Sequence, residues 1–232
     1  MKTANKVTNE GVYSPSIFVS QQTTNKYTIS ITDNISDTFI YDEVLMVLEN
    51  AEENDEVVFN IASYGGQLNS LLSIRSAILS TKATVTGKLV SHACSAAGML
   101  LLSCHNKIVY PNTMFHAHTA SYGSYGKSGD VKAQVDFETK QIEDLVYDIY
   151  GDGFLLESEI IDLLNGKELY FNDVDTMERL ERQSKTKIEK ALGEVNKPID
   201  MSQYTDEELE NELSLYKEDV KMIQNELKKR KK

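Results

Sequence analysis

The sequence predicts a soluble α/β domain that contains parallel strand pairings. Short runs rich in β-branched and aromatic residues alternate with helical patterns, and the connections between them are short. The runs at 57–62 and 83–90 are hydrophobic almost throughout, which is typical of strands buried on both faces of a parallel sheet.

Composition narrows the classes of function. The 232 residues are 41% hydrophobic, which suffices for a core, and their formal net charge of -12 argues against a nucleic-acid partner. Two cysteines are too few for a disulfide framework. No run of about 18 apolar residues suggests a membrane span. We therefore expect a cytoplasmic protein without nucleic-acid or membrane partners.

The first part of the chain predicts an arm followed by a strand and a helix. Residues 1–26 are rich in polar types, so we expect an arm that orders only against a partner. Residues 27–31 alternate in polarity and predict the first strand. Asp37 is expected to cap the following helix. The apolar face of that helix should comprise Ile40, Val44, Val47, Leu48 and Ala51.

Two turns follow the buried strands. Gly65 and Gly66 end the strand at 57–62 and precede a helix at 67–79. Such a pair indicates either a simple turn or a backbone N–H left open to a substrate carbonyl. Ser95 follows the strand at 83–90 and opens a short apolar helix that ends near residue 104. It is either a helix cap or a nucleophile near free N–H groups.

Two histidines occupy the strand expected at 113–118. Residues 107–110 predict the strand before it, and Pro111-Asn112 predicts the turn between the two. His116 and His118 are two residues apart, so both side chains should face the same side of the sheet. Each is either a hydrogen-bonded core residue or a general base. We expect no metal here, because no thiolate or carboxylate lies nearby at ligand spacing.

The remaining elements are mainly helical. A loop at 119–129 precedes a long helix at 130–150, which could project and pack against a second copy of the chain. A helix at 157–164, a strand at 167–171 and a helix through residue 180 capped by Asp173 complete the body.

Residues 185–232 form a tail of a different kind. A capping box begins at Thr205, and apolar residues then recur at intervals of four and three. This pattern predicts either a coiled coil between subunits or an amphipathic helix on its own domain. The seam consists of Leu209, Leu213, Tyr216, Val220, Ile223 and Leu227.

The order of these motifs resembles that of the ClpP family of serine peptidases. In that family a strand ends in Ser-Pro-Gly-Gly, and residues 63–66 match it with Tyr64 in place of proline. A helix-opening Ala-Ala-Ser-Met follows, matched by residues 93–96, and a Pro-Asn turn then leads to the catalytic histidine. The resemblance covers roughly residues 27–180, and several motifs in order make chance a poor explanation.

The resemblance implies a catalytic triad without metal or organic cofactor. Ser95 would be the nucleophile and His118 the general base, with the backbone N–H groups of Gly66 and Ala96 as the oxyanion hole. The family usually has an aspartate as the third member. Glu168 stands at that place here, and Asp173 is the substitute.

The resemblance also implies an architecture and partners. The family fold is a crotonase-like spiral of strand–strand–helix units, here residues 27–184 with a handle helix at about 130–150 and an added helical tail. Family members form stacked homo-oligomeric rings and hydrolyse polypeptides supplied by an ATP-driven (AAA+) unfoldase. Divergent members are bacteriophage prohead maturation proteases acting on capsid or scaffold proteins, in the host cytoplasm or the prohead. The departures at Tyr64, Thr119 and Glu168 favour this second setting.

Three alternatives compete with a serine endopeptidase. The first is a catalytically silent ring or scaffold subunit that works through its coiled-coil tail. The second is a crotonase-like acyl-CoA enzyme, although no basic cluster suits the CoA phosphates. The third is a serine–lysine dyad, for which Lys88 and Lys107 are the candidates.

Overall fold

A computed structural model describes residues 24–195 and Thr205. The expectations for the arm up to residue 23, for the capping box beyond Thr205 and for the heptad seam lie outside these residues. The chain divides into two compact units, residues 1–184 and 185–232, and the fold below is that of the first. Among the described residues, no helix combines the length and apolar character needed to cross a bilayer.

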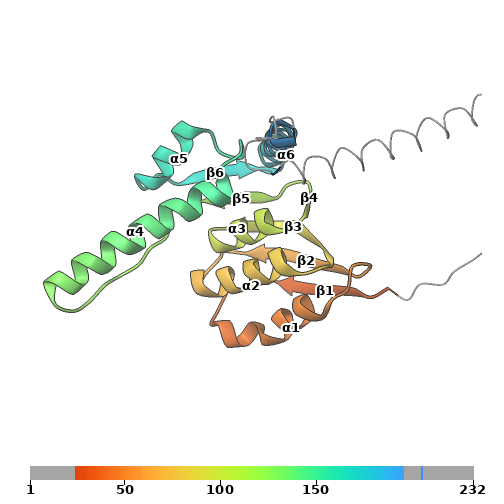
Figure 1. The fold of residues 1–232 in the computed structure, drawn as a ribbon, viewed down its shortest axis with the longest axis horizontal. Coiled ribbons are helices and arrows are strands. Elements are labelled where there is room, and N and C mark those ends of the chain that lie inside the picture. Colours follow the sequence, from red (N-terminus) through yellow and green to blue (C-terminus); the bar gives the residue numbers. More distant parts are fainter. Residues whose placement is uncertain (1–23, 196–204, 206–232) are drawn as a thin grey trace, which may run out of the picture. The chain divides into compact units, whose positions relative to one another are not determined.

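The described elements alternate between strands and helices, which confirms the expected α/β class (Figure 1). In chain order they are β1 (Lys26–Ile31), the 3-10 helix η1 (Thr38–Tyr41), α1 (Asp42–Asn50), β2 (Glu56–Ser63), α2 (Leu68–Ser80), β3 (Thr84–Cys94), α3 (Ala96–Ser103), β4 (Asn106–Val109), β5 (Met114–Ala117), α4 (Ser128–Tyr150), α5 (Glu157–Leu164), β6 (Leu169–Asn172) and α6 (Asp173–Val195).

The described strands form one sheet in the order β1-β2-β3-β5-β6, with β4 also paired to β3. β1 to β5 pair in parallel, whereas β6 runs antiparallel to β5. β3 is long enough to pair with β4 through 86–89 and then with β5 through 92–94. Because the carboxyl ends of parallel strands meet at one edge, the residues that follow β2, β3 and β5 come together there.

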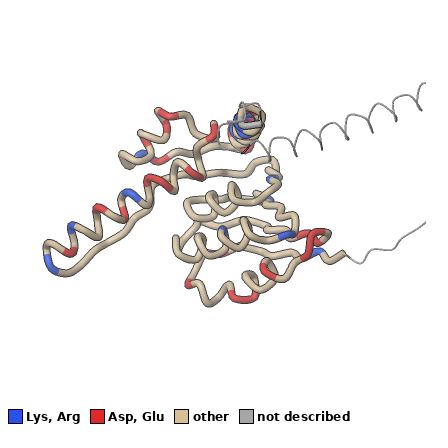
Figure 2. Tube along the Cα trace, in the orientation of Figure 1, with Lys and Arg blue, Asp and Glu red and all other residues tan. Residues whose placement is uncertain are grey.

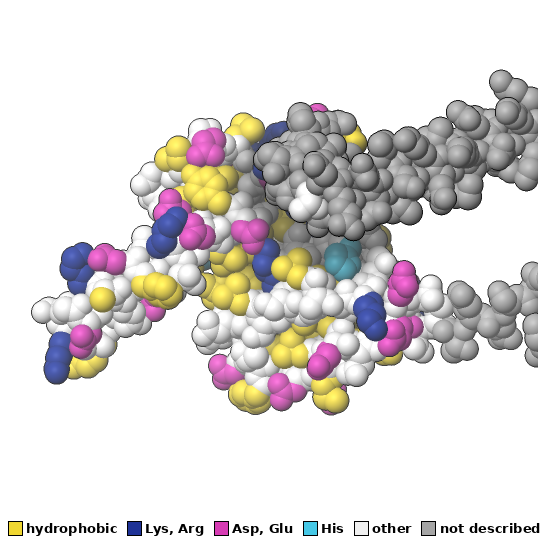
Figure 3. All heavy atoms as spheres, in the orientation of Figure 1, with side chains coloured by type: hydrophobic (Ala, Val, Ile, Leu, Met, Phe, Trp, Pro, Cys, Tyr) yellow, Lys and Arg dark blue, Asp and Glu magenta, His cyan; other side chains and the backbone are white. Residues whose placement is uncertain are grey.

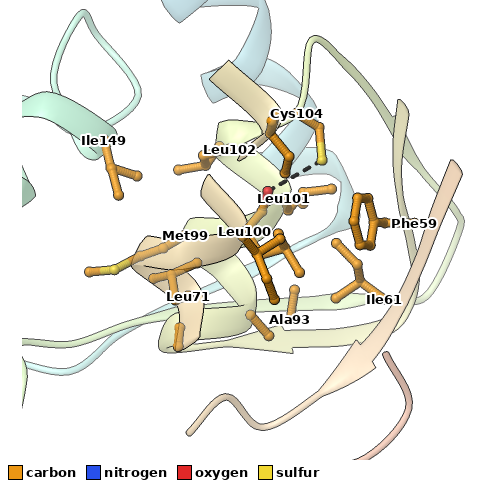
Figure 4. Packing of buried hydrophobic residues seen from close by; sticks show 14 of the residues in the cluster. Phe59, Ile61, Leu71, Ala93, Met99, Leu100, Leu101, Leu102, Cys104 and Ile149 are labelled. Atoms are coloured by element: carbon orange, nitrogen blue, oxygen red, sulfur yellow. Dashed lines mark hydrogen bonds between the residues drawn. The ribbon is translucent and has the colours of Figure 1, made fainter. Parts of the chain in front are cut away.

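Helices cover one face of this sheet. Figure 1 shows α1, α2 and α3 lying against the sheet formed by β1 to β3. Every residue of α3 from Ala96 to Leu102 is buried, which fits a helix that is apolar all round. Its side chains pack against β2, β3, α2 and the end of α4 (Figure 4). The labelled core residues are Phe59, Ile61, Leu71, Ala93, Met99, Leu100, Leu101, Leu102, Cys104 and Ile149.

The long helix α4 projects from the body, with the preceding loop running beside it (Figure 1). Two hydrogen bonds hold the loop there: one joins Tyr122 Oη and Thr139 Oγ1 at 2.7 Å, and in the other Ser124 Oγ donates to Gln134 Oε1 at 2.8 Å. Figure 2 shows basic and acidic residues interspersed along α4, and several form ion pairs one turn apart. The apolar side chains at the C-terminal end of α4 are buried, and Arg75 of α2 forms an ion pair with Asp148 there.

Two expectations for helix starts were wrong. Asp37 precedes η1 rather than α1 and makes no side-chain capping hydrogen bond, and Ile40 is 54% exposed rather than on the buried face. Asp173 does not cap α6 either. Asn172 accepts the hydrogen bond from the Asp175 N–H at 2.8 Å and so caps this helix, which runs to Val195 rather than ending near residue 180.

Surface composition agrees with the acidic charge of the chain. Figure 3 shows acidic and hydrophobic side chains interspersed over the lower edge, where α1 lies in this view. Phe39, Ile40 and Met46 are the large exposed apolar side chains of η1 and α1. Isolated exposed apolar residues of this kind are normal in folded proteins.

Tyr150 provides a test of the core. Its ring is fully buried against Phe115 and Phe154, and its hydroxyl has no hydrogen-bond partner among the described residues. Burial raises the pKa of the Tyr150 phenol, so the group stays neutral. We expect Tyr150→Phe to raise the free energy of unfolding by about 1 kcal/mol, because a buried unpaired hydroxyl is destabilising.

Urea denaturation monitored by circular dichroism would measure this change through the transition midpoint at constant m-value. Tyr147→Phe is the matched control, since Tyr147 Oη donates to Glu157 Oε1 at 2.8 Å near the surface. A midpoint lowered by Tyr150→Phe would contradict the assignment of an unpaired hydroxyl.

Candidate active site

Ser95 lies at a sharp turn between β3 and α3. Its backbone has φ 54° and ψ -126°, a conformation that residues other than glycine rarely adopt. The Ser95 N–H donates to His116 O at 2.9 Å, and Ser95 O accepts from the Met99 N–H at 3.1 Å. The sheet and the first turn of α3 therefore hold this backbone from both sides. Strain of this kind gathers at functional sites and resembles a nucleophile elbow.

The hydroxyl of Ser95 takes no part in capping α3. Although Ser95 occupies the N-cap position, its side chain makes no capping hydrogen bond, so the helix-cap interpretation was wrong. The residue is half-buried. The N–H groups of the first turn of α3 lack intrahelical partners and carry the positive end of the helix dipole. A reaction that develops negative charge beside Ser95 would be stabilised there.

Gly65 packs directly against this turn. With φ +97°, it lies so close that an added Cβ would be 2.5 Å from Cys94 O, 2.8 Å from Ser95 Cβ and 3.0 Å from Ala96 N. The buried Ser63 hydroxyl accepts a hydrogen bond from the Gly65 N–H at 3.1 Å and fixes the turn. A glycine is therefore required here.

Gly66 faces a different neighbour. It forms a parallel bridge with Ile35, in which the Ile35 N–H donates to Gly65 O at 2.7 Å and Ile35 O accepts from the Gln67 N–H at 2.8 Å. An added Cβ would be 2.1 Å from Ile35 O. In a parallel ladder the bridged residue itself points its N–H away from that partner. The N–H of Gly66 is therefore directed away from Ile35.

The two histidines and Glu168 share one face of the sheet. In the β5–β6 register, His116 lies opposite Tyr170, and Ala117 lies opposite Leu169. Alternation places His118 and Glu168 as the next opposed residues, on the same face as His116 and Tyr170. Phe115, the residue before His116, points to the opposite face of the sheet, where it contacts Phe154 with ring centroids 5.0 Å apart.

The Glu168 carboxylate contacts His116, whereas it was expected to orient His118. Glu168 Oε2 lies 2.5 Å from His116 Nε2, diagonally across the strand pair. The ring of His116 stacks between Tyr170, at 4.1 Å and 5°, and His118, at 5.1 Å and 2°. Neighbours on the same face of an antiparallel pair are within reach of long side chains along this diagonal. The expected acid therefore contacts the expected base only through a second histidine.

The substitutes considered from sequence lie at other places. Asp173 follows the far end of β6, about 16 Å from Glu168 at the usual rise per strand residue. Lys88 lies six residues before Cys94 on β3, about 20 Å away by the same rise. Lys107 pairs with Gly87 and is no nearer. Neither Asp173 nor a serine–lysine dyad fits this geometry.

Cysteine chemistry and metal ligation receive little support from the described residues. Burial raises the pKa of the Cys94 thiol and raises that of Cys104 to about 12, so both thiols stay protonated. Within residues 24–195 and at Thr205, no group of three or more His, Cys, Asp or Glu side chains converges to form a metal site.

A family model described as Clp protease matches residues 14–178, well over half of the chain. The chain belongs to the Clp protease family. This match confirms the resemblance found in the sequence, and Clp proteases are peptidases that typically assemble into oligomeric rings. A search of curated proteins found no match.

Sequence reasoning missed two features of this Clp protease site. The strained backbone of Ser95 could not be predicted, because the G-x-S-x-G pattern is absent and the turn is enforced by the distant Gly65. The contact of His116 with Glu168 was also missed. The spacing of His116 from His118 already placed both rings on one face, and this was the available signal.

A matched pair of glycine variants tests the packing of Gly65 against Ser95. Gly65 and Gly166 both have positive φ, but an added Cβ at Gly166 meets no atom within 4 Å. We expect Gly166→Ala to destabilise by about 1 kcal/mol through backbone strain alone. Gly65→Ala should cost several-fold more, because strain adds to a clash with backbone atoms.

Thermal unfolding of both variants beside wild type would measure the difference. Similar losses of stability in the two variants would contradict the close packing of Gly65 on the Ser95 turn.

Proposed function

We propose that this Clp protease family member is a serine endopeptidase that cleaves peptide bonds through an acyl-enzyme on Ser95. The observation that carries this proposal is the strained backbone of Ser95, whose hydroxyl is not used to cap α3. Strain without a structural use for the side chain favours a functional role.

In the proposed reaction Ser95 is the nucleophile and His118 is the general base. Ser95 Oγ attacks the scissile carbonyl carbon while His118 accepts the hydroxyl proton, which gives a tetrahedral oxyanion. Collapse of this species breaks the C–N bond, and His118 donates the proton to the leaving amine. Water then attacks the acyl-enzyme with His118 again as base, releasing the carboxyl product and restoring Ser95.

Two backbone N–H groups are proposed to bind the oxyanion. Ala96 is the first residue of α3, so its N–H belongs to the unpaired first turn. The N–H of Gly66 points away from Ile35, and Gly65 next to it packs against Ser95 and Ala96. Donors fixed in this way stabilise developing charge without reorganisation, and each typically contributes about 100-fold or more to kcat.

Glu168 is proposed as the acidic member of the triad. It is the residue opposite His118 at the end of the β5–β6 pair, and its carboxylate already contacts the histidine pair through His116. An acidic group near the base stabilises the imidazolium that forms when the serine proton is transferred.

We also propose a homo-oligomeric ring that encloses these sites, as is typical of the family. The projecting α4 offers a second copy an exposed surface that includes Phe137, while Tyr125 in the loop beside it is fully exposed. Substrates would be unfolded chains from an AAA+ unfoldase or, for a phage prohead protease, capsid and scaffold proteins. The setting would be the cytoplasm or the prohead.

Fluorophosphonate labelling tests the proposed chemistry. We expect stoichiometric labelling of assembled wild-type protein, observed as a single adduct by intact mass, and none of Ser95→Ala. His118→Ala should be labelled at least about 100-fold more slowly, because general-base catalysis typically contributes that much. Lys88→Ala, remote from Ser95, is the matched control and should react at the wild-type rate.

Absence of labelling on assembled wild-type protein would overturn the peptidase proposal and favour a silent ring subunit. Labelling that persists in Ser95→Ala would place the nucleophile elsewhere.

A further inference from the structure

The pairing of His116 with Glu168 is not explained by a triad of Ser95, His118 and Glu168 alone. The side chain of His116 is 13% exposed, whereas that of Glu168 is 52% exposed. The hydrogen-bonded histidine is therefore the more enclosed partner, and Glu168 reaches it from the open edge of the sheet. Holding a histidine ring this way fixes its orientation and its tautomer.

His116 also holds the general base through its ring face. The His116 ring is stacked with the Tyr170 ring and with the His118 ring, and the planes of these two pairs differ by 5° and 2°. In stacked imidazoles the N–H groups lie in the ring planes and point sideways, so His116 and His118 cannot hydrogen-bond one another. Their contact fixes the plane of His118 while leaving its two nitrogens available.

We propose that His116 is a positioning residue that couples Glu168 to His118. Glu168 fixes His116 through the hydrogen bond to Nε2, Tyr170 stacks on the His116 ring, and His116 in turn sets the orientation of the His118 ring for proton transfer from Ser95. Glu168 thus acts on the base through His116 by orientation, not by passing a proton. This inference rests on the proposed function of Ser95 and His118.

Two variants of His116 separate its two contacts. His116→Phe keeps a flat ring between Tyr170 and His118 but loses the hydrogen bond to Glu168. His116→Gln keeps an amide donor for Glu168 but loses the stacked ring. Because small misplacements of catalytic groups are costly, we expect each variant to slow the labelling step by about tenfold or more.

Fluorophosphonate inactivation kinetics give the readout. Both variants should lower the maximal inactivation rate and leave the half-saturating reagent concentration within about twofold of wild type. Tyr170→Phe is the matched control, because it keeps the supporting ring, and it should retain both values. In the His118→Ala background, His116→Phe should cause no further loss, since His116 acts only through His118.

The outcomes distinguish failure of the His116 proposal from failure of the peptidase proposal. Wild-type kinetics in both His116 variants, with His118→Ala still defective, would overturn the role of His116 and leave the peptidase proposal intact. A faster reaction in His116→Phe would also overturn it, because His116 would then be withdrawing Glu168 from His118. Defective His116 variants with an active His118→Ala would make His116 the base, and an unlabelled wild type would remove the peptidase proposal itself.

Discussion

The site depends on a close contact between two chain turns, that of Gly65 against Ser95. β2 and β3 are neighbours in the sheet, and the turns that follow them meet at its carboxyl edge. The absence of a side chain at Gly65 permits the approach, while the hydrogen bond from the Ser95 N–H to His116 O ties the same turn to β5. Three strands thus fix one strained residue, and the fully buried α3 behind it resists relaxation.

Much of this arrangement could be predicted from sequence, because the determining signals are local. The hydrophobic strand at 57–62, the double glycine and the small residues around Ser95 indicate buried parallel strands with tight strand-to-helix turns. The boundaries of α5 were predicted correctly, and those of α4 within two residues. Both helices end at turns that contain glycine, which the sequence shows directly. Family motifs then added the order of the site residues.

The remainder depends on contacts between segments far apart in the chain. Nothing local distinguishes Glu168 bound to His118 from Glu168 bound to His116, because that choice is made across the β5–β6 pair. Register decides this outcome, and a shift of one residue would reverse which side chains share a face. The cap of α6 lies at Asn172 rather than Asp173 because α6 follows β6 directly, so the last residue of the strand is also the N-cap of the helix.

In the proposed site, the Ser95 turn presents a nucleophile beside the Gly66 and Ala96 N–H groups. The most direct measurement is a crystal structure of the protein treated with a peptide boronic acid, which forms a tetrahedral adduct with an active serine. The account predicts a bond from Ser95 Oγ to boron and one boronate oxygen within about 3.1 Å of both N–H groups. A boronate bound elsewhere, or an oxygen directed away from Gly66 and Ala96, would contradict it.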